Sequence, residues 1–182
     1  MFAIQCDNGS LNFAATIPSP RIKVPDKIQY WKEQGDWTKE NVPISVLLIG
    51  LDSTSRAHAY RSFPETMSLL KKLGFVDLQG HHSVSAYTLH NFYALLAGST
   101  MEDIFTGCMY GWVSRSYTGC PWIWNHFDLL QYITLYMEDH YGSFNSQTDK
   151  TEFAKPPTDY YIHPLLVEMH KYWLKQPGGV RL

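Results

Sequence analysis

Two oxygen-bearing side chains stand at positions suited to catalytic chemistry. Asp52 directly follows an aliphatic run at residues 44–51, and Thr88 opens a segment of helical character at residues 88–98. A carboxylate at the carboxyl end of a buried strand can hold a hard or borderline cation. A hydroxyl at a helix N-terminus can become a nucleophile when a nearby cation stabilises its alkoxide. Asp52 is therefore the candidate metal ligand and Thr88 the candidate nucleophile.

Both residues also have a plain structural explanation. Aspartate is common in loops between strands and helices, where its carboxylate accepts hydrogen bonds from backbone amides. A threonine at the start of a helix is often only an N-cap, which stabilises the helix by about 1 kcal/mol. The local pattern alone favours the structural explanation for both Asp52 and Thr88.

Other polar residues lie close to this pair in the sequence or follow a similar strand. Asn91, three residues after Thr88, falls within the first turn of the same expected helix and can donate to a substrate oxygen. Glu138 and Asp139 end a second expected strand. They either border the same crevice as Asp52, beyond the carboxyl ends of the strands, or bind loop amides. Arg56 can meet an anionic substrate or form a surface ion pair, which is the commoner use of arginine.

The elements that must position these residues follow from the hydrophobic pattern and from helix signals. The continuous aliphatic run at residues 44–51 is typical of a strand that is buried on both faces. A helix is expected to begin with a capping box of Ser62 and Glu65 and to end at Gly74 as its C′ residue. A short strand is expected at residues 75–79, so that strand, helix and strand form a βαβ unit.

The rest of the chain gives fewer signals. Residues 1–43 contain several prolines and no sustained period, so an irregular arm is expected there. Residues 140–159 are expected to form a loop, and residues 176–182 a tail that packs on nothing. The remaining expected elements are a helix at 88–98, a helical turn at Glu102 and Asp103, a helix at 121–131, a strand at 132–137 and a helix at 164–174.

The composition indicates one globular domain of ordinary size. The chain has 182 residues, of which 45% are hydrophobic and 18% charged, with a net charge of -2. No basic block is present, so a nucleic-acid surface is not expected. No run approaches the roughly 18 apolar residues of a membrane span, and the N-terminus does not have the pattern of a signal peptide. The many aromatic residues suit a thick core, or a surface that contacts carbohydrate or protein.

The three cysteines leave the redox state open. Their odd number and the absence of a C-x-x-C pair argue against a zinc ribbon. Cys108 and Cys120 flank a loop-like segment rich in Gly, Ser and Tyr. They are expected to form a disulfide if the chain is extracellular, and two reduced thiols are the alternative.

The motifs taken together resemble a known family. The aliphatic run followed by Asp52-Ser53-Thr54-Ser55-Arg56 resembles the "DSxSR" segment of the DUF229 family, a group within the alkaline phosphatase and sulfatase superfamily. The order of later segments is also similar over roughly residues 40–175. These segments are FPETMSLLKKLG, YTLHNFYALLAG, CPWIWNHF, the strand that runs into Glu138-Asp139, and KPPTDYY.

This resemblance implies a fold and a set of roles. The expected fold is α/β, with a partial parallel sheet flanked by helices over residues 44–175, as the first half of an alkaline-phosphatase-like domain. By position, Asp52 matches a metal ligand and Thr88 the nucleophile, whereas Asn91 matches an asparagine that would steady the oxygens of the transferred group. The resemblance further implies a divalent metal, zinc or calcium, and an anionic ester substrate.

The resemblance also leads to an expectation about activity. Superfamily members complete the metal site with an Asp-His pair later in the domain, and the pair Asp139-His140 comes too early to match it. We therefore expect a fragment or short isoform of a metal-dependent phosphate or sulfate ester hydrolase, weakly active or inactive alone. The alternative is a non-catalytic extracellular binding domain of the same fold. The family likeness suggests an extracellular or membrane-associated location.

Overall fold

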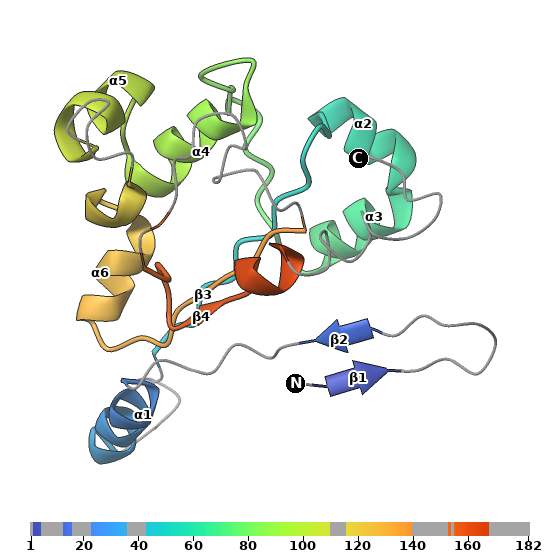
Figure 1. The fold of residues 1–182 in the computed structure, drawn as a ribbon. Coiled ribbons are helices and arrows are strands. Elements are labelled where there is room, and N and C mark those ends of the chain that lie inside the picture. Colours follow the sequence, from blue (N-terminus) through green and yellow to red (C-terminus); the bar gives the residue numbers. More distant parts are fainter. Residues whose placement is uncertain are drawn as a thin grey trace. The chain divides into compact units, whose positions relative to one another are not determined.

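The computed structural model describes residues 2–4, 13–15, 23–35, 43–109, 116–139, 153 and 155–167 (Figure 1). The chain divides into two compact units. We call Met1–Gly35 together with Leu89–Leu182 the disulfide unit, and Asp36–Thr88 the Asp52 unit.

The disulfide unit combines short helices with two small sheets. Strands β1 (Phe2–Ile4) and β2 (Phe13–Ala15) pair antiparallel, whereas β3 (Leu135–Tyr136) and β4 (Tyr160–Tyr161) pair parallel, with Leu135 opposite Tyr160. The helices are α1 (Val24–Glu33), α4 (Thr88–Ala97, whose first residue belongs to the Asp52 unit), α5 (Met101–Asp103) and α6 (Ile123–Leu129). A π-helical turn, Ile104–Cys108, continues α5, a 3-10 turn covers Tyr117–Gly119, and residues 163–167 are helical. Helices and a parallel strand pair are consistent with the expected α/β class.

A disulfide and a cluster of aromatic rings form the core of this unit. Cys108 and Cys120 are bonded, which decides the question that the sequence left open. The Tyr93 and Tyr117 hydroxyls are 2.7 Å apart, and the Trp122 indole N–H donates to the Tyr117 carbonyl oxygen at 2.8 Å. The polar ends of these buried rings are thus hydrogen-bonded, as a dry core requires. The buried cluster comprises Tyr93, Ile104, Met109, Tyr117, Cys120, Trp122, Trp124, Phe153 and Tyr161.

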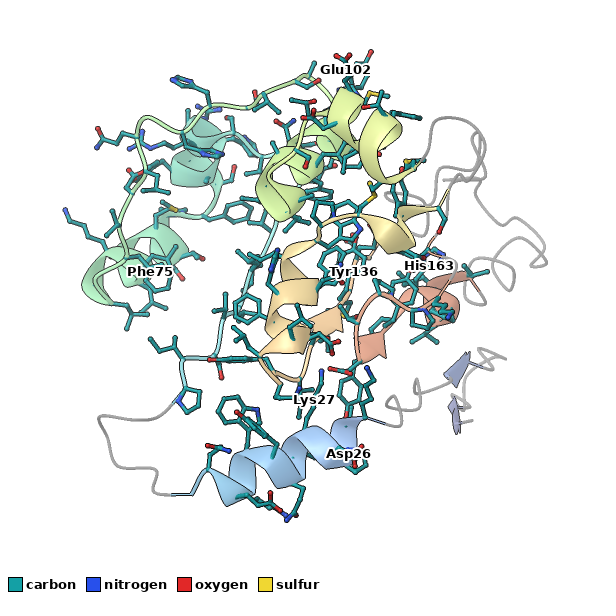
Figure 2. All side chains as sticks on the ribbon, turned by 90° about the vertical axis from the view of Figure 1, so that its left-hand side faces the viewer. Asp26, Lys27, Phe75, Glu102, Tyr136 and His163 are labelled. Atoms are coloured by element: carbon teal, nitrogen blue, oxygen red, sulfur yellow. A yellow bond between two sulfur atoms is a disulfide. The ribbon has the colours of Figure 1, made fainter. Side chains whose placement is uncertain are left out.

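A buried lysine fastens α1 to the rest of the disulfide unit. The Lys27 side chain is 2% exposed and points from α1 toward α6 (Figure 2). Its ammonium donates to Asp128 Oδ1 at 2.5 Å, to the Tyr132 carbonyl oxygen at 2.7 Å and to Asp159 Oδ2 at 2.6 Å. Asp159 Oδ2 also accepts from the Thr134 amide and hydroxyl at 2.9 and 3.1 Å. All three ammonium protons therefore have acceptors, which is how a buried charge is tolerated.

The Asp52 unit is built differently. Its helices α2 (Arg56–Ser62) and α3 (Pro64–Lys72) follow each other in the chain, and none of the described residues 43–88 is buried. The aliphatic run at 44–51 forms no regular structure, and Ile44 and Leu47 are 79% and 81% exposed. This unit is held by hydrogen bonds and helix ends rather than by a core.

Two expected strands of this unit are therefore wrong in the structure. Residues 44–51 and 75–79 are described as irregular chain, without strand pairing. Apolar composition identifies a segment that suits a sheet, but a strand exists only when a neighbouring chain accepts its backbone hydrogen bonds.

The helix between these segments is partly as expected. Gly74 has φ of +80°, its amide donates to the Lys71 carbonyl, and the Phe75 amide donates to the Leu70 carbonyl. This is a Schellman end with glycine at C′, as predicted. The capping box is wrong, because Ser62 ends α2, its hydroxyl lies 3.2 Å from His58 Nε2, and Phe63 stands at the N-cap of α3.

Of the other expected elements, the structure confirms some, shortens some and contradicts one. The helix at 88–98 is confirmed as α4, and the turn at Glu102 and Asp103 is confirmed as α5, which Thr100 caps. The expected helix at 121–131 and strand at 132–137 are present but shorter, as α6 and β3. The arm at 1–43 is not irregular throughout, since it contains α1 and the β1–β2 pair. Pro25 does not prevent α1, because it occupies the first turn, where a missing N–H costs nothing.

Some expectations fall on residues outside those described. The loop at 140–159 is described only at 153 and 155–159, and β4 follows it at Tyr160. The last helix, expected at 164–174, is described as helical over 163–167, and the tail at 176–182 lies outside the described residues. Within the described residues, no helix combines the length and the apolar character needed to cross a membrane.

Candidate functional site

The structure brings the two principal candidate residues together. The Thr88 hydroxyl donates to Asp52 Oδ1 at 3.0 Å, although 36 positions separate the residues in the sequence. Asp52 is exposed and Thr88 is half-buried, so the pair lies at the surface of the Asp52 unit. Direct contact with a carboxylate gives the hydroxyl proton an acceptor.

Short local contacts shape the loop that follows Asp52. Ser53 adopts φ of +54°, a left-handed conformation that is uncommon for a residue with a side chain. The Thr54 hydroxyl donates to the Asp52 carbonyl oxygen at 3.2 Å. Ser55 then accepts the His58 amide at 3.1 Å as the N-cap of α2. The chain thus turns sharply after Asp52 and enters a helix within three residues.

Arg56, the last residue of the D-S-T-S-R motif, forms an ion pair rather than an open anion site. Its guanidinium Nε donates to Asp77 Oδ1 at 2.9 Å, and its Nη2 donates to Asp77 Oδ2. The Tyr60 hydroxyl donates to the same oxygen at 2.9 Å, and the guanidinium carbon lies 4.9 Å from the centroid of the Tyr60 ring. The hydrogen bonds from Arg56 and then Tyr60 lower the pKa of the Asp77 carboxyl to about 2.

Thr88 owes its position to the start of α4. It is the first helical residue, where the backbone amides have no partner within the helix. These amides and the helix dipole favour a negative group at this place. A hydroxyl here can therefore give its proton to Asp52 and face an anion from the helix side.

Asn91 and Glu138 have different surroundings. Asn91 is half-buried on α4 in the disulfide unit, so its part in the candidate site stays a prediction. Glu138 follows β3, and both of its carboxylate oxygens are buried. Burial raises the pKa of the Tyr136 hydroxyl, and the charge of Glu138 raises it further. Glu138 thus lies beside a core tyrosine, whereas Asp139 is exposed.

Asp52 and Thr88 place two oxygens where one cation could contact both. Two oxygens 3.0 Å apart can contact one hard or borderline cation together. A catalytic divalent ion takes three or more protein ligands. Among the described residues, no group of three or more His, Cys, Asp or Glu side chains could hold a metal ion. The pair fits such an ion in type and spacing but does not complete its ligand set.

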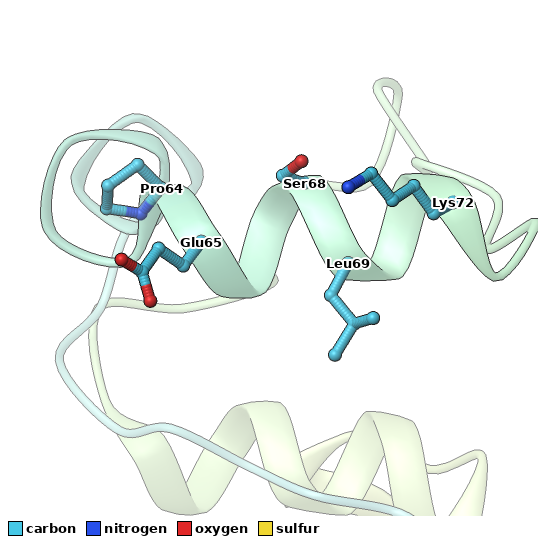
Figure 3. A pocket seen from close by; sticks show the side chains of 5 residues that line it. All are labelled: Pro64, Glu65, Ser68, Leu69 and Lys72. Atoms are coloured by element: carbon cyan, nitrogen blue, oxygen red, sulfur yellow. The ribbon is translucent and has the colours of Figure 1, made fainter.

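Two pockets lie elsewhere. One, of about 370 Å³, runs along α3 and is lined by Pro64, Glu65, Ser68, Leu69 and Lys72 (Figure 3). The other, of about 200 Å³, lies in the disulfide unit, with the aromatic residues Trp122, Trp124 and Phe153 in its wall and Lys155 at its edge. Neither of these pockets includes Asp52 or Thr88.

Sequence reasoning did not find the partner of Arg56. Asp77 follows α3, 21 positions after Arg56, in the middle of the segment at residues 75–79 that was expected to be a strand. The argument from an acid at a strand end, which singled out Asp52 and Glu138, therefore does not find it. Tyr60 offered a usable signal, since it stands one helical turn after Arg56.

Comparison with known proteins adds one match. A protein-family model described as "Protein of unknown function (DUF229)" matches residues 1–178. Neither the curated proteins nor the solved structures gave a match to this chain.

Proposed function

Because the chain belongs to the DUF229 family, we propose that its Asp52–Thr88 pair belongs to the site of a metal-dependent phosphate or sulfate ester hydrolase. In this proposal the Thr88 oxygen attacks the phosphorus or sulfur atom of the ester, the alcohol leaves as its bond to that atom breaks, and water then releases phosphate or sulfate from Thr88. Asp52 would bind the metal ion, and Asn91 would donate to the oxygens of the transferred group. The substrate is an anionic ester. The metal is divalent, zinc or calcium by resemblance, and when bound it supplies the positive charge that stabilises the Thr88 alkoxide.

The observation that carries the proposal is the hydrogen bond from Thr88 to Asp52. An unactivated threonine hydroxyl is a weak nucleophile, so a hydrolase must give its proton an acceptor or stabilise its alkoxide. Asp52 Oδ1, at 3.0 Å, is within reach of that proton. The pair therefore offers a nucleophile and a base or metal ligand in direct contact.

We also propose that the α/β fold of this chain is alkaline-phosphatase-like. An alkaline-phosphatase-like domain contains a parallel sheet and binds its ligands beyond the carboxyl ends of the strands. The parallel pairing of β3 and β4 supports the proposal. An extracellular location is proposed with it, and the Cys108–Cys120 bond supports it, because disulfides persist in oxidising compartments.

We expect weak turnover from this chain. One carboxylate and one hydroxyl are fewer ligands than a tightly held catalytic ion requires. A sensitive assay is therefore needed, with 4-nitrophenyl phosphate and 4-nitrophenyl sulfate as probes and with zinc or calcium added in turn.

Thr88→Ala tests the role of the nucleophile. We expect this variant to abolish ester hydrolysis at an almost unchanged melting temperature. The matched control is Thr100→Ala, which removes a hydroxyl of the same kind at the start of α5, in the disulfide unit. The control should lose a little stability through its cap and keep its hydrolysis rate.

A different result would favour the rival function, a non-catalytic extracellular binding domain. In that case the wild-type chain would bind neither added metal, and it would hydrolyse neither probe. The effect of Thr88→Ala would then be limited to the loss of a helix-start hydroxyl, about 1 kcal/mol of stability.

A further inference from the structure

Three side chains of the Asp52 unit form a closed polar cluster that includes the arginine of the D-S-T-S-R motif. Asp77 accepts from both Arg56 and Tyr60, and the Arg56 guanidinium lies over the Tyr60 ring. Each member thus contacts the other two. We call Arg56, Tyr60 and Asp77 the arginine cluster.

The arginine cluster joins segments that are distant in the sequence. Arg56 is the first residue of α2, whereas Asp77 follows the C-terminal end of α3. The paired fork of the guanidinium fixes direction as well as distance, which a single hydrogen bond does not. The start of α2 is therefore fixed relative to the chain that leaves α3.

Fixing the start of α2 also fixes the loop that carries Asp52. Ser55, the N-cap of α2, directly precedes Arg56, and only Ser53 and Thr54 separate Ser55 from Asp52. No described residue of 43–88 is buried, so apolar packing cannot hold this loop in place. Polar contacts must therefore hold the loop. Among the contacts described around it, the arginine cluster has the largest number of side-chain hydrogen bonds.

We propose that Arg56 and Asp77 are positioning residues that hold the Asp52 carboxylate against the Thr88 hydroxyl. The inference rests on the proposed hydrolase function and deepens it, since neither residue contacts the ester. The arginine of the D-S-T-S-R motif is thus used to set the geometry of its aspartate, and it does not bind the anionic substrate.

Because the arginine cluster is exposed, a positioning role should affect the rate and the melting temperature to different degrees. Surface ion pairs contribute little to stability, so weakening this one should change the melting temperature by no more than about 2 °C. A misplacement of about 1 Å between reacting groups can lower a rate roughly 100-fold. A positioning role therefore predicts a large loss of rate beside a small loss of stability.

Arg56→Lys is the test variant, and Arg61→Lys in the same helix is its matched control. Lysine keeps the positive charge but cannot form the paired fork. We expect Arg56→Lys to lower kcat at least ten-fold with an almost unchanged KM, and Arg61→Lys to leave both at the wild-type values. An unchanged kcat in Arg56→Lys would overturn the proposal, even if its melting temperature fell.

A second measurement does not depend on hydrolysis. The ¹³Cβ NMR signal of Thr88 senses its hydrogen bond to Asp52, and Asp52→Ala gives the reference for the broken bond. Arg56→Lys should move the Thr88 signal toward that reference, whereas Arg61→Lys should not. If the wild-type chain proves inactive, the proposed function fails while this signal still decides the positioning role. A Thr88 signal that stays at its wild-type position in Arg56→Lys would overturn that role.

Discussion

The two units of this chain differ in how they are held together. The disulfide unit has a buried aromatic cluster, a disulfide and a buried lysine with three acceptors. The Asp52 unit has no buried residue among positions 43–88, and its described contacts are helix ends and exposed polar pairs. Yet this second unit contains both members of the candidate catalytic pair. The buried core and the Asp52–Thr88 pair thus lie in different parts of the chain.

This difference has a consequence for mutagenesis. Substitutions in the disulfide unit should mainly change the free energy of unfolding, because they remove buried contacts. Substitutions in the Asp52 unit should mainly change geometry and reactivity, because exposed contacts contribute little to stability. Four predictions test this contrast, and they run from the largest expected effect on stability to the smallest.

The buried lysine should give the largest effect. Lys27→Met keeps the length of the side chain but leaves the buried Asp159 carboxylate without its counter-ion. Breaking a buried pair in this way costs about 3–5 kcal/mol of unfolding free energy. Chemical denaturation of Lys27→Met and of Lys32→Met, which alters an exposed lysine of α1, measures the difference. Equal losses in the two variants would show that Lys27 does not act as a buried partner.

Removal of the disulfide should rank next. Cys108 and Cys120 are separated by 12 positions, and a loop of about this length gives a bond worth about 3 kcal/mol. We expect Cys108→Ser/Cys120→Ser to lose about that amount in denaturant unfolding. A reducing agent should produce a similar loss in the wild-type chain and none in the double variant. A double variant as stable as wild type would show that the disulfide does not stabilise this unit.

The pH dependence of stability should show the state of Asp159. Burial raises the pKa of Asp159, but the hydrogen bonds from Lys27 and Thr134 outweigh it and leave the pKa below its ordinary value. A lowered folded pKa stabilises the protein above the unfolded value of about 3.9, and this stability is lost as the pH falls through the folded pKa. Denaturation of the wild-type chain and Asp159→Asn between pH 7 and pH 3 tests this. The stability difference between them should be large at pH 7 and shrink below pH 4.

The exposed ion pair of the Asp52 unit should affect stability least. Arg56→Gln removes the guanidinium whose hydrogen bonds are the main cause of the lowered pKa of Asp77, about 2, so this pKa should rise toward its ordinary value. Carboxyl NMR signals followed from pH 6 to pH 2 measure it directly, and Arg61→Gln serves as the control. The melting temperature should hardly change, in contrast to the Lys27 variant. A large fall in melting temperature for Arg56→Gln would contradict the contrast between the two units.

The sequence predicted some elements well because their signals are local. The end of α3 at Gly74 and the capped turn at Thr100 depend on residues within one or two helical turns. The same reasoning failed for residues 44–51 and 75–79, where composition favours a strand but the described chain has no partner for it. It also missed α1, because the proline at its start resembles a helix breaker.

The same limit applies to the candidate site. Residues at the boundaries of elements could be predicted from the sequence, but their distant partners could not. Asp52 and Thr88 were predicted as candidates because each lies at the boundary of an expected element, and the structure places their side chains in contact. The partners of Arg56 and Lys27 were not found, because Asp77 lies 21 positions from Arg56 and Asp159 lies 132 positions from Lys27. No local pattern gives the distance between such residues.

By itself the sequence determined which residues have chemistry to offer and which short segments form helices, since both depend on residue type and near neighbours. Only the tertiary structure decided that Thr88 donates to Asp52, that Cys108 bonds to Cys120, and that Lys27 is buried. These contacts depend on the path of the chain between distant residues, and signals from near neighbours in the sequence do not determine that path.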